Sequence, residues 1–109
     1  MQAPTELRVS RDRRTLHVAF ADETHDIPAE LLRVESPSAE VQGHAPSQKT
    51  LVTGKEDVTI TDIVPTGRYA VRIAFDDGHS TGIYTWETLA RFGREGEAML
   101  ADYRARVAG

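Results

Sequence analysis

The sequence predicts an α+β fold: an antiparallel sheet of about five to six strands, a short helix after the third strand, and two C-terminal helices packed on the sheet. Three observations favour it. Several short segments alternate between apolar and polar residues. An Asp77-Gly78 pair separates two of them. After Trp86 the apolar residues recur at helical spacing instead. A chain of 109 residues fits one domain, residues 1–109.

The first part of the chain predicts a three-stranded meander. Thr5–Ser10 and Thr15–Phe20 both alternate, and the polar run 11–14 between them predicts a hairpin with a longer loop. Asp22-Glu23 is typical of a second turn, which leads into a short third strand at Thr24–Ile27. Three strands are therefore expected before the first helix.

The next segment predicts a single turn of helix followed by a long polar loop. Pro28 suits the first position of a helix over 29–33, and Ser36-Pro37-Ser38 ends it because a residue before proline avoids the helical region. Residues 39–57 are mostly polar, and a loop of this length is usually either functional or mobile. Val58–Val64 then alternates as a strand.

The stretch from Tyr69 to Trp86 predicts the central hairpin of the domain. Asp77 and Gly78 are expected at the centre of a type I′ turn, which needs positive φ at both positions. One face then gathers aromatic and aliphatic side chains, so we predict that it forms the core. The predicted cross-strand pairs are Asp76–His79, Phe75–Ser80, Ile73–Gly82, Val71–Tyr84 and Tyr69–Trp86.

Two helices are predicted after this hairpin. Thr85 can cap the first, whose apolar positions are Trp86, Leu89 and Phe92, and Gly93 is expected to end it. The second helix carries an apolar stripe, at Met99, Leu100, Tyr103 and Val107.

Composition excludes several classes of function. Seventeen acidic and thirteen basic residues give a formal charge of −4, which argues against a nucleic-acid partner, since such proteins carry a basic face. The absence of cysteine excludes disulfides, thiolate metal sites and a cysteine nucleophile. No segment approaches the ~20 apolar residues of a membrane span, and none resembles a signal peptide. We therefore expect a cytoplasmic protein with no membrane partner.

The catalytic motifs that we tested do not hold. Gly54-Lys55 lacks the earlier glycine and the following Ser or Thr of a phosphate-binding loop. His79 and Ser80 cannot readily form a nucleophile–base pair, because adjacent strand residues point to opposite faces. Asp76 and Asp77 could be an acid–base pair, but turns also select aspartate for local hydrogen bonding, which is the simpler interpretation.

Two histidines leave alternatives open. His44 and His79 lie in or beside polar segments, and together with Asp76 or Glu40 they could hold a divalent metal. The simpler interpretation is that His79 forms a hydrogen bond across the turn to Asp76.

Three segments together resemble a known family: LLRVESPSAEVQGH at 31–44, Gly67–Phe75, and DDGHSTGIYTW at 76–86. They are similar to the gamma-butyrobetaine hydroxylase-like N-terminal domain. That family occurs alone in bacteria, as the front domain of carnitine-pathway 2-oxoglutarate oxygenases, and appended to iron–sulfur carrier ATPases. The jelly-roll oxygenase domain of those relatives has no room in a chain of this length, so the resemblance implies no hydroxylase activity.

The resemblance also implies a metal site that this chain has lost. In the hydroxylase version, three cysteines in the segment matching 36–41 bind a structural zinc with the histidine that matches His79. The cysteine positions correspond here to Ser36, Ser38 and Val41. Because hydroxyls are poor zinc ligands and valine is none, only His79 remains.

We therefore expect a non-catalytic accessory domain that binds another protein, with an iron–sulfur carrier ATPase as the first candidate and no cofactor. The alternative is a small-ligand or metal-binding domain that uses His44 and His79, and a hydrolytic enzyme ranks third. The predicted interaction surface consists of Ser36, Ser38, Glu40, His44, Asp76, Asp77 and His79.

Overall fold

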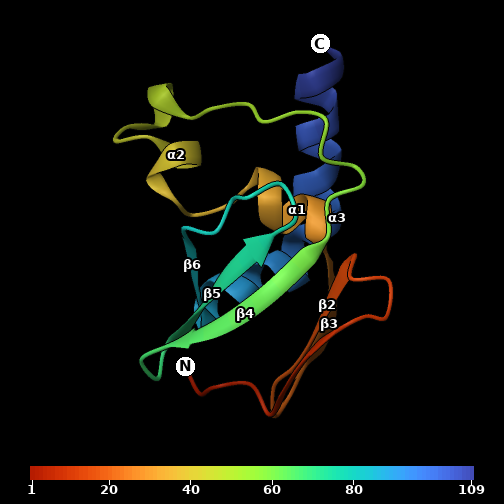
Figure 1. Ribbon diagram of the computed structural model, residues 1–109, viewed down its shortest axis with the longest axis vertical. Coiled ribbons are helices and arrows are strands. Elements are labelled where there is room, and N and C mark those ends of the chain that lie inside the picture. Colours follow the sequence, from red (N-terminus) through yellow and green to blue (C-terminus); the bar gives the residue numbers. More distant parts are fainter.

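The computed structural model describes residues 1–109 and shows two three-stranded antiparallel sheets with a long C-terminal helix (Figure 1). The first sheet has the order β1-β2-β3 and the second the order β4-β5-β6. In chain order, the elements are β1 (Glu6–Val9), β2 (Thr15–Ala19), β3 (Thr24–Pro28), α1 (Ala29–Val34), α2 (Ala39–Gln42), a 3₁₀ turn (Pro46–Gln48), β4 (Ile60–Thr66), β5 (Ala70–Phe75), β6 (Gly82–Thr85) and α3 (Trp86–Ala108). The α+β class and the opening meander are confirmed.

The prediction of a single five- or six-stranded sheet was wrong, because backbone hydrogen bonds join the two sheets at one point only. Arg13, in the turn between β1 and β2, accepts a hydrogen bond from the Ile60 N–H through its carbonyl (2.8 Å). Its guanidinium donates back to the Ile60 carbonyl (2.9 Å). Ile60 is the first residue of β4. Backbone hydrogen bonds therefore link β4 to the first sheet only at the β1–β2 turn, and the strand pairs along its length with β5.

The predicted register of β5 and β6 is confirmed, whereas the predicted turn and the two predicted pairs beside it, Phe75–Ser80 and Asp76–His79, were wrong. Val71 pairs with Tyr84 and Ile73 with Gly82. Only Gly78 has positive φ (92°) in this turn, so the two-residue type I′ geometry is not formed. Instead, the Phe75 N–H bonds to the His79 carbonyl (2.9 Å) and closes a three-residue loop. One extra residue between His79 and Gly82 then restores the predicted pairing.

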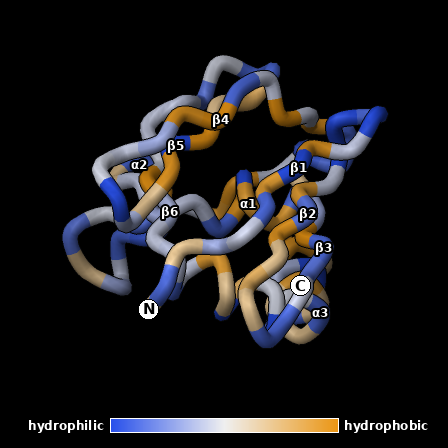
Figure 2. The backbone as a smooth tube through the Cα atoms, turned by 90° about the horizontal axis from the view of Figure 1, so that it is seen from below, coloured by the Kyte–Doolittle hydropathy of each residue, from blue (hydrophilic) through white to orange (hydrophobic).

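The hydrophobic core lies between the two sheets, α1 and α3, and 17 buried residues form it. Figure 2 shows the hydrophobic stretches of β2, β4, β5 and α1 that contribute to it. Val71, Ile73, Phe75, Tyr84 and Trp86 are all buried there, as predicted.

Tyr69 departs from the predicted core. It is 59% exposed, because it precedes β5 at the turn that follows β4. A Cβ on Gly67 would lie 2.9 Å from the Tyr69 ring, which places the ring over the turn and not under the helices.

The predicted break between two C-terminal helices was also wrong, since α3 runs unbroken from Trp86 to Ala108. Thr85 caps it as expected: its hydroxyl oxygen accepts a hydrogen bond from the Thr88 N–H (3.1 Å). Gly93 lies inside the helix, where a Cβ would overlap the His25 ring. The glycine therefore allows β3 to approach α3 closely, and this packing offsets the poor helix propensity of glycine.

The long polar segment contains α2 and the 3₁₀ turn, and it is tied down at two points. The Thr50 N–H donates to the Val41 carbonyl (2.7 Å), and the Tyr103 hydroxyl of α3 donates to the Val52 carbonyl (2.6 Å). Figure 1 shows this segment passing from α2 to α3, with the C-terminus at the far end of α3. None of the helices is long and apolar enough to cross a membrane.

Candidate functional site: a buried histidine cluster

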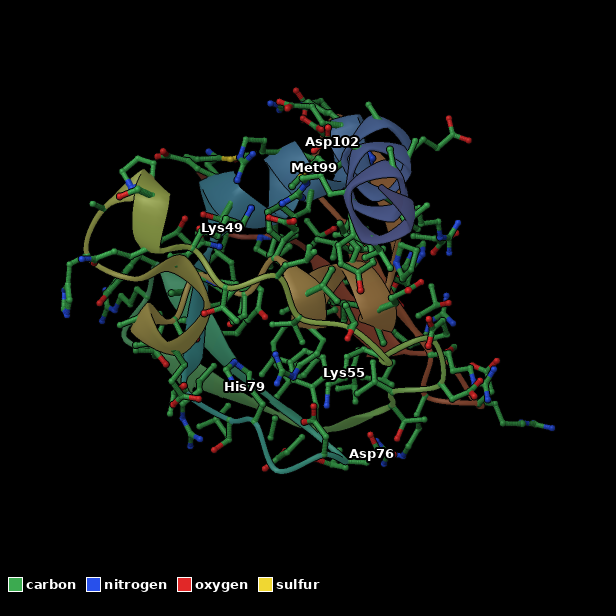
Figure 3. The ribbon with its side chains drawn as sticks, turned by 90° about the horizontal axis from the view of Figure 1, so that it is seen from above. Lys49, Lys55, Asp76, His79, Met99 and Asp102 are labelled. Atoms are coloured by element: carbon green, nitrogen blue, oxygen red, sulfur yellow. The ribbon has the colours of Figure 1, made fainter.

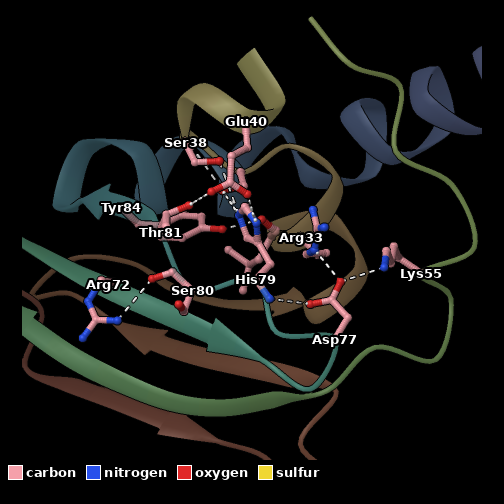
Figure 4. Close-up of polar contacts among 12 residues, drawn as sticks. Arg33, Ser38, Glu40, Lys55, Arg72, Asp77, His79, Ser80, Thr81 and Tyr84 are labelled. Carbon is pink, nitrogen blue, oxygen red and sulfur yellow. Dashed lines mark hydrogen bonds and ion pairs between the residues drawn. The ribbon is translucent and has the colours of Figure 1, made fainter. Parts of the chain in front are cut away.

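Two segments that are distant in the chain, residues 36–40 and the β5–β6 hairpin, meet around the side chain of His79 (Figure 4). His79 closes the turn between β5 and β6. Ser36 and Ser38 follow α1, and Glu40 lies in the first turn of α2. Because Pro37 stops the helix there, the two serines lie in extended chain that can approach the hairpin. We call Ser36, Ser38, Glu40 and His79 the histidine cluster.

Both nitrogens of the His79 ring are engaged. Nε2 lies 2.9 Å from the Ser36 hydroxyl and 3.4 Å from the Ser38 hydroxyl, and Nδ1 lies 3.3 Å from a Glu40 carboxylate oxygen. An ionised carboxylate can only accept hydrogen bonds, so Nδ1 carries the proton and Nε2 accepts from serine. Burial lowers the pKa of His79, and the nearby Arg33 guanidinium lowers it further against the opposing effect of Glu40. The imidazole is therefore neutral at pH 7.

Glu40 is the member of the cluster that reaches solvent. Its side chain is 64% exposed, whereas that of His79 is 3% exposed. The Thr81 hydroxyl of the hairpin donates to its second carboxylate oxygen (3.0 Å). Two contacts from the β5–β6 hairpin therefore hold an exposed carboxylate in one orientation.

Tyr84 and Gly82 form the floor beneath the cluster. The buried Tyr84 hydroxyl donates to the Leu32 carbonyl (2.5 Å), one of the carbonyls left without a partner at the end of α1. Burial raises the pKa of this phenol well above its usual range. A Cβ on Gly82 would overlap the Ser36 hydroxyl, so only glycine leaves room for that serine.

Asp77 lies in the turn of the β5–β6 hairpin and ties it to Arg33 of α1 and to Lys55. One of its carboxylate oxygens accepts from the Arg33 Nε and from the Lys55 ammonium (2.7 Å each), and the other accepts from the His79 N–H (3.0 Å). Burial opposes ionisation, but these hydrogen bonds outweigh it and hold the pKa of Asp77 well below its usual range. Asp76 is exposed and accepts from the Thr59 N–H (3.0 Å). The two aspartates bond to different groups, and both contacts tie the hairpin to neighbouring segments.

The structure brings together only part of the predicted interaction surface. Ser36, Ser38 and His79 are buried, and the Asp77 side chain is only 17% exposed. Glu40 and Asp76 are exposed. His44 is also exposed, and its N–H donates to the Gln48 side chain (2.9 Å).

One predicted contact of His79 was wrong, and the pairing with Ser80 that the sequence argued against is not formed. The simpler interpretation, a hydrogen bond from the His79 ring to Asp76, was wrong, because the ring turns toward Ser36 and Glu40. Ser80 bonds through its carbonyl to Arg72 (3.2 Å) and makes no hydrogen bond to the ring.

Sequence reasoning missed the residues that support the cluster, namely Arg33, Lys55, Thr81 and Tyr84 in its hydroxyl role. The position of Arg33 in α1 and that of Thr81 in the hairpin carry no periodic signal. The sequence does predict Tyr84 in the core. A buried tyrosine hydroxyl needs a hydrogen-bond partner, and this requirement could have indicated the role of its hydroxyl.

The residues of the cluster do not fit the zinc ion that the family resemblance implies. The positions match: Ser36 and Ser38 come together on His79, where the resemblance places two of the three thiolates. Their chemistry does not match, because two neutral hydroxyls and the buried Val41 replace three thiolates. No group of three or more histidine, aspartate or glutamate side chains is arranged to hold a metal ion.

The structure is thus a small α+β fold in which a buried histidine joins the end of α1 and α2 to the β5–β6 hairpin. Residues 7–90 match the family model described as gamma-butyrobetaine hydroxylase-like, N-terminal, and the chain belongs to that family. The comparison with curated proteins gave no match.

Solved structures of similar proteins share the fold. Two are solution structures determined by NMR, whose proteins are 39% and 40% identical to this chain, with TM-scores of 0.85 and 0.83. The alignments cover 100% and 99% of this chain and 86% and 81% of theirs. A third is the crystal structure of a DUF971-family protein of unknown function from Acidithiobacillus ferrooxidans. It is 43% identical, with a TM-score of 0.69, and the alignment covers 83% of this chain and 91% of that one.

Proposed function

We propose that this chain is a non-catalytic accessory domain that acts by binding another protein. The observation that carries the proposal is the Glu40 carboxylate, which is exposed and held by Thr81 and His79. A side chain fixed before binding loses less conformational entropy when a partner arrives. A fixed carboxylate is also a strong acceptor for arginine or lysine. The partner surface that fits it is therefore basic.

The state of the histidine cluster supports a scaffolding role over catalysis. A general base must come within hydrogen-bonding reach of its substrate. The His79 ring is buried, and both of its nitrogens are already bonded to the chain. None of the surface cavities is lined by Ser36, Ser38 or His79.

An iron–sulfur carrier ATPase is the first partner to test. The support for this choice is the family itself, because some members are appended to such ATPases. A domain that is covalently joined in one protein and separate in another often keeps the same contact surface. On this proposal the basic partner surface faces Glu40 and the exposed Asp76.

The experiment is a binding measurement between the purified chain and the iron–sulfur carrier ATPase from the same cells. Glu40→Gln keeps the shape of the side chain and removes its charge, so it is expected to weaken binding about tenfold or more. Glu97→Gln is the matched control, since Glu97 is exposed on α3 and forms no ion pair. It is expected to leave the affinity unchanged.

Thr81→Val tests whether the orientation of Glu40 matters. It removes the hydroxyl that holds the carboxylate while keeping the charge. A loss of affinity smaller than that of Glu40→Gln is expected. Equal affinities for the original chain and for Glu40→Gln would contradict the proposed surface, and no measurable binding would contradict this partner class.

A further inference from the structure

The outer edge of β1 lacks the features that protect the outer edges of β3 and β4. β1 pairs with β2 alone, so its other edge has no strand partner. The outer edge of β4 contains Pro65 and an irregularity in its pairing near Ile60, and both features hinder the addition of a further strand. Figure 2 shows α3 beside β3. The β1 edge is therefore available to a further strand.

The backbone groups of Leu7 and Val9 point away from β2. The Ser10 N–H, at the position after β1, donates to the Thr15 carbonyl (2.9 Å). Along an antiparallel strand, residues that bond to the neighbouring strand alternate with residues that do not. The even-numbered residues of β1 therefore bond to β2, and the odd-numbered residues turn their N–H and C=O groups outward.

The apolar side chains of β1 are incompletely covered at this edge. Leu7 and Val9 pack against the core but remain partly exposed. Val18 and Leu16, which lie opposite them on β2, are fully buried. The difference follows from position, because β2 has a strand on each side and β1 has a strand on one side only. A further strand at β1 would cover both side chains.

The charged side chains of β1 have a self-complementary pattern. Glu6 and Arg8 lie on the other face of the strand, and each side chain is more than half exposed. Their closest charged atoms are 3.7 Å apart, too far for a hydrogen bond within the chain. In an antiparallel pair of two copies centred on Leu7, each Glu6 lies opposite Arg8 of the second copy. A pair centred on Arg8 would place two arginines opposite each other, which is unfavourable.

We propose that two copies of this chain pair through β1, antiparallel and centred on Leu7. The two first sheets then form one six-stranded sheet, and Leu7 of each copy exchanges two backbone hydrogen bonds with Leu7 of the other. The four residues of β1 are few beside the ~20–30 residues a side of a stable interface, so the dissociation constant is expected on the order of 0.1–1 mM.

This dimer leaves the proposed partner surface free. Figure 2 and Figure 3 show the first sheet on one side of the molecule and α2, which carries Glu40, on the other. The inference therefore does not depend on the proposed function, and either can fail without the other.

The test of the register is an isotope-filtered NMR experiment on an equal mixture of ¹³C,¹⁵N-labelled and unlabelled chain at about 2 mM. An NOE is expected between the Glu6 Hα of one copy and the Arg8 Hα of the other, because residues opposite each other in a non-bonded pair approach most closely. The amide signals of Leu7 and Val9 are expected to shift on dilution. An NOE between the two Arg8 Hα atoms would contradict the register.

Charge reversal tests the role of the side chains. Arg8→Glu places like charges opposite each other at both ends of the pair, so the dissociation constant is expected to rise about tenfold. Adding Glu6→Arg to that variant restores opposite charges and is expected to restore dimerisation. Arg91→Glu is the matched control, since it makes the same charge change at an exposed position of α3, and its dissociation constant is expected to stay that of the original chain.

Three results would overturn the proposal. The first is the absence of any concentration dependence up to about 2 mM. The second is an Arg8→Glu variant that dimerises as well as the original chain. The third is a double variant that does not recover, although its amide spectrum at high dilution is that of the folded chain.

Discussion

The Nε2 atom of His79 lies 2.9 Å from the Ser36 hydroxyl, although 43 residues separate the two positions in the chain. This contact attaches the end of α1 to the β5–β6 hairpin. It also places the other ring nitrogen opposite Glu40, the one exposed carboxylate that the hairpin holds. The His79 ring thus makes the buried contact through one nitrogen and contacts the proposed binding surface through the other.

Gly82→Ala is expected to lower the free energy of unfolding by about 1–3 kcal/mol, because the new methyl group would overlap the Ser36 hydroxyl in a fully buried site. Urea unfolding followed by circular dichroism measures it. Ser36→Ala removes that hydroxyl, so the cost of Gly82→Ala is expected to be smaller in the Ser36→Ala background. An equal cost in both backgrounds would show that the overlap is with another group.

Tyr84→Phe is expected to destabilise the chain by about 1–2 kcal/mol, since it leaves the Leu32 carbonyl without its hydrogen bond inside the core. The free energy of unfolding is again the readout. Tyr69→Phe is the matched control, because Tyr69 is 59% exposed and its hydroxyl makes no bond to the chain. Similar losses in the two variants would mean that the Tyr84 hydroxyl contributes nothing specific.

Stability is expected to fall as the pH drops below about 6.5, the ordinary pKa of a histidine. The folded chain holds the pKa of His79 below that value, so the unfolded state binds a proton first, and protonation then favours unfolding. The contribution is fully present above 6.5 and is lost as the pH falls through the lowered pKa. Hydrogen bonds from Arg94 and His25 lower the pKa of Glu23 to about 2. That carboxyl group therefore titrates at a lower pH than His79.

The readout for this pH dependence is the unfolding free energy of the original chain and of His79→Gln between about pH 7.5 and pH 5. Glutamine cannot be protonated there, so the His79→Gln curve is expected to be flatter. Parallel curves for the two proteins would assign the pH dependence to other groups.

Native mass spectrometry of protein purified without chelator is expected to give the mass of the chain alone, because two hydroxyls and one imidazole are a poor donor set for zinc. The combined variant Ser36→Cys, Ser38→Cys, Val41→Cys is expected to gain one zinc ion per chain. That gain would follow from thiolates placed beside His79, where the serine hydroxyls now lie. A zinc ion in the original chain, or none in the variant, would contradict this explanation of the lost site.

The strand pairing of the central hairpin could be predicted because its determinants are local. Alternation fixes which side chains share a face, and Val71 therefore lies opposite Tyr84 as expected. The turn type could not be predicted as safely, because Asp77-Gly78 also suits a three-residue loop in which only the glycine has positive φ. The alternation of apolar and polar residues also does not indicate whether successive strands belong to one sheet or to two.

The parts that escaped prediction depend on contacts between distant segments. Gly93 indicates a helix end when read locally, but the approach of His25 gives it another role within α3. His79 follows a polar turn, which indicated an accessible position, yet Ser36 and Ser38 cover it from another part of the chain. Only the family resemblance indicated that these three positions meet, since the spacing of the residues does not.

The most direct test of the scaffold role of His79 is the titration of its ring by long-range ¹H–¹⁵N NMR. We predict a neutral ring at pH 7, protonated on Nδ1, that gains its second proton only below the ordinary histidine pKa of about 6.5. A ring that carries its proton on Nε2, or that is already charged at pH 7, would contradict the buried contact on which the proposed scaffold role of His79 depends.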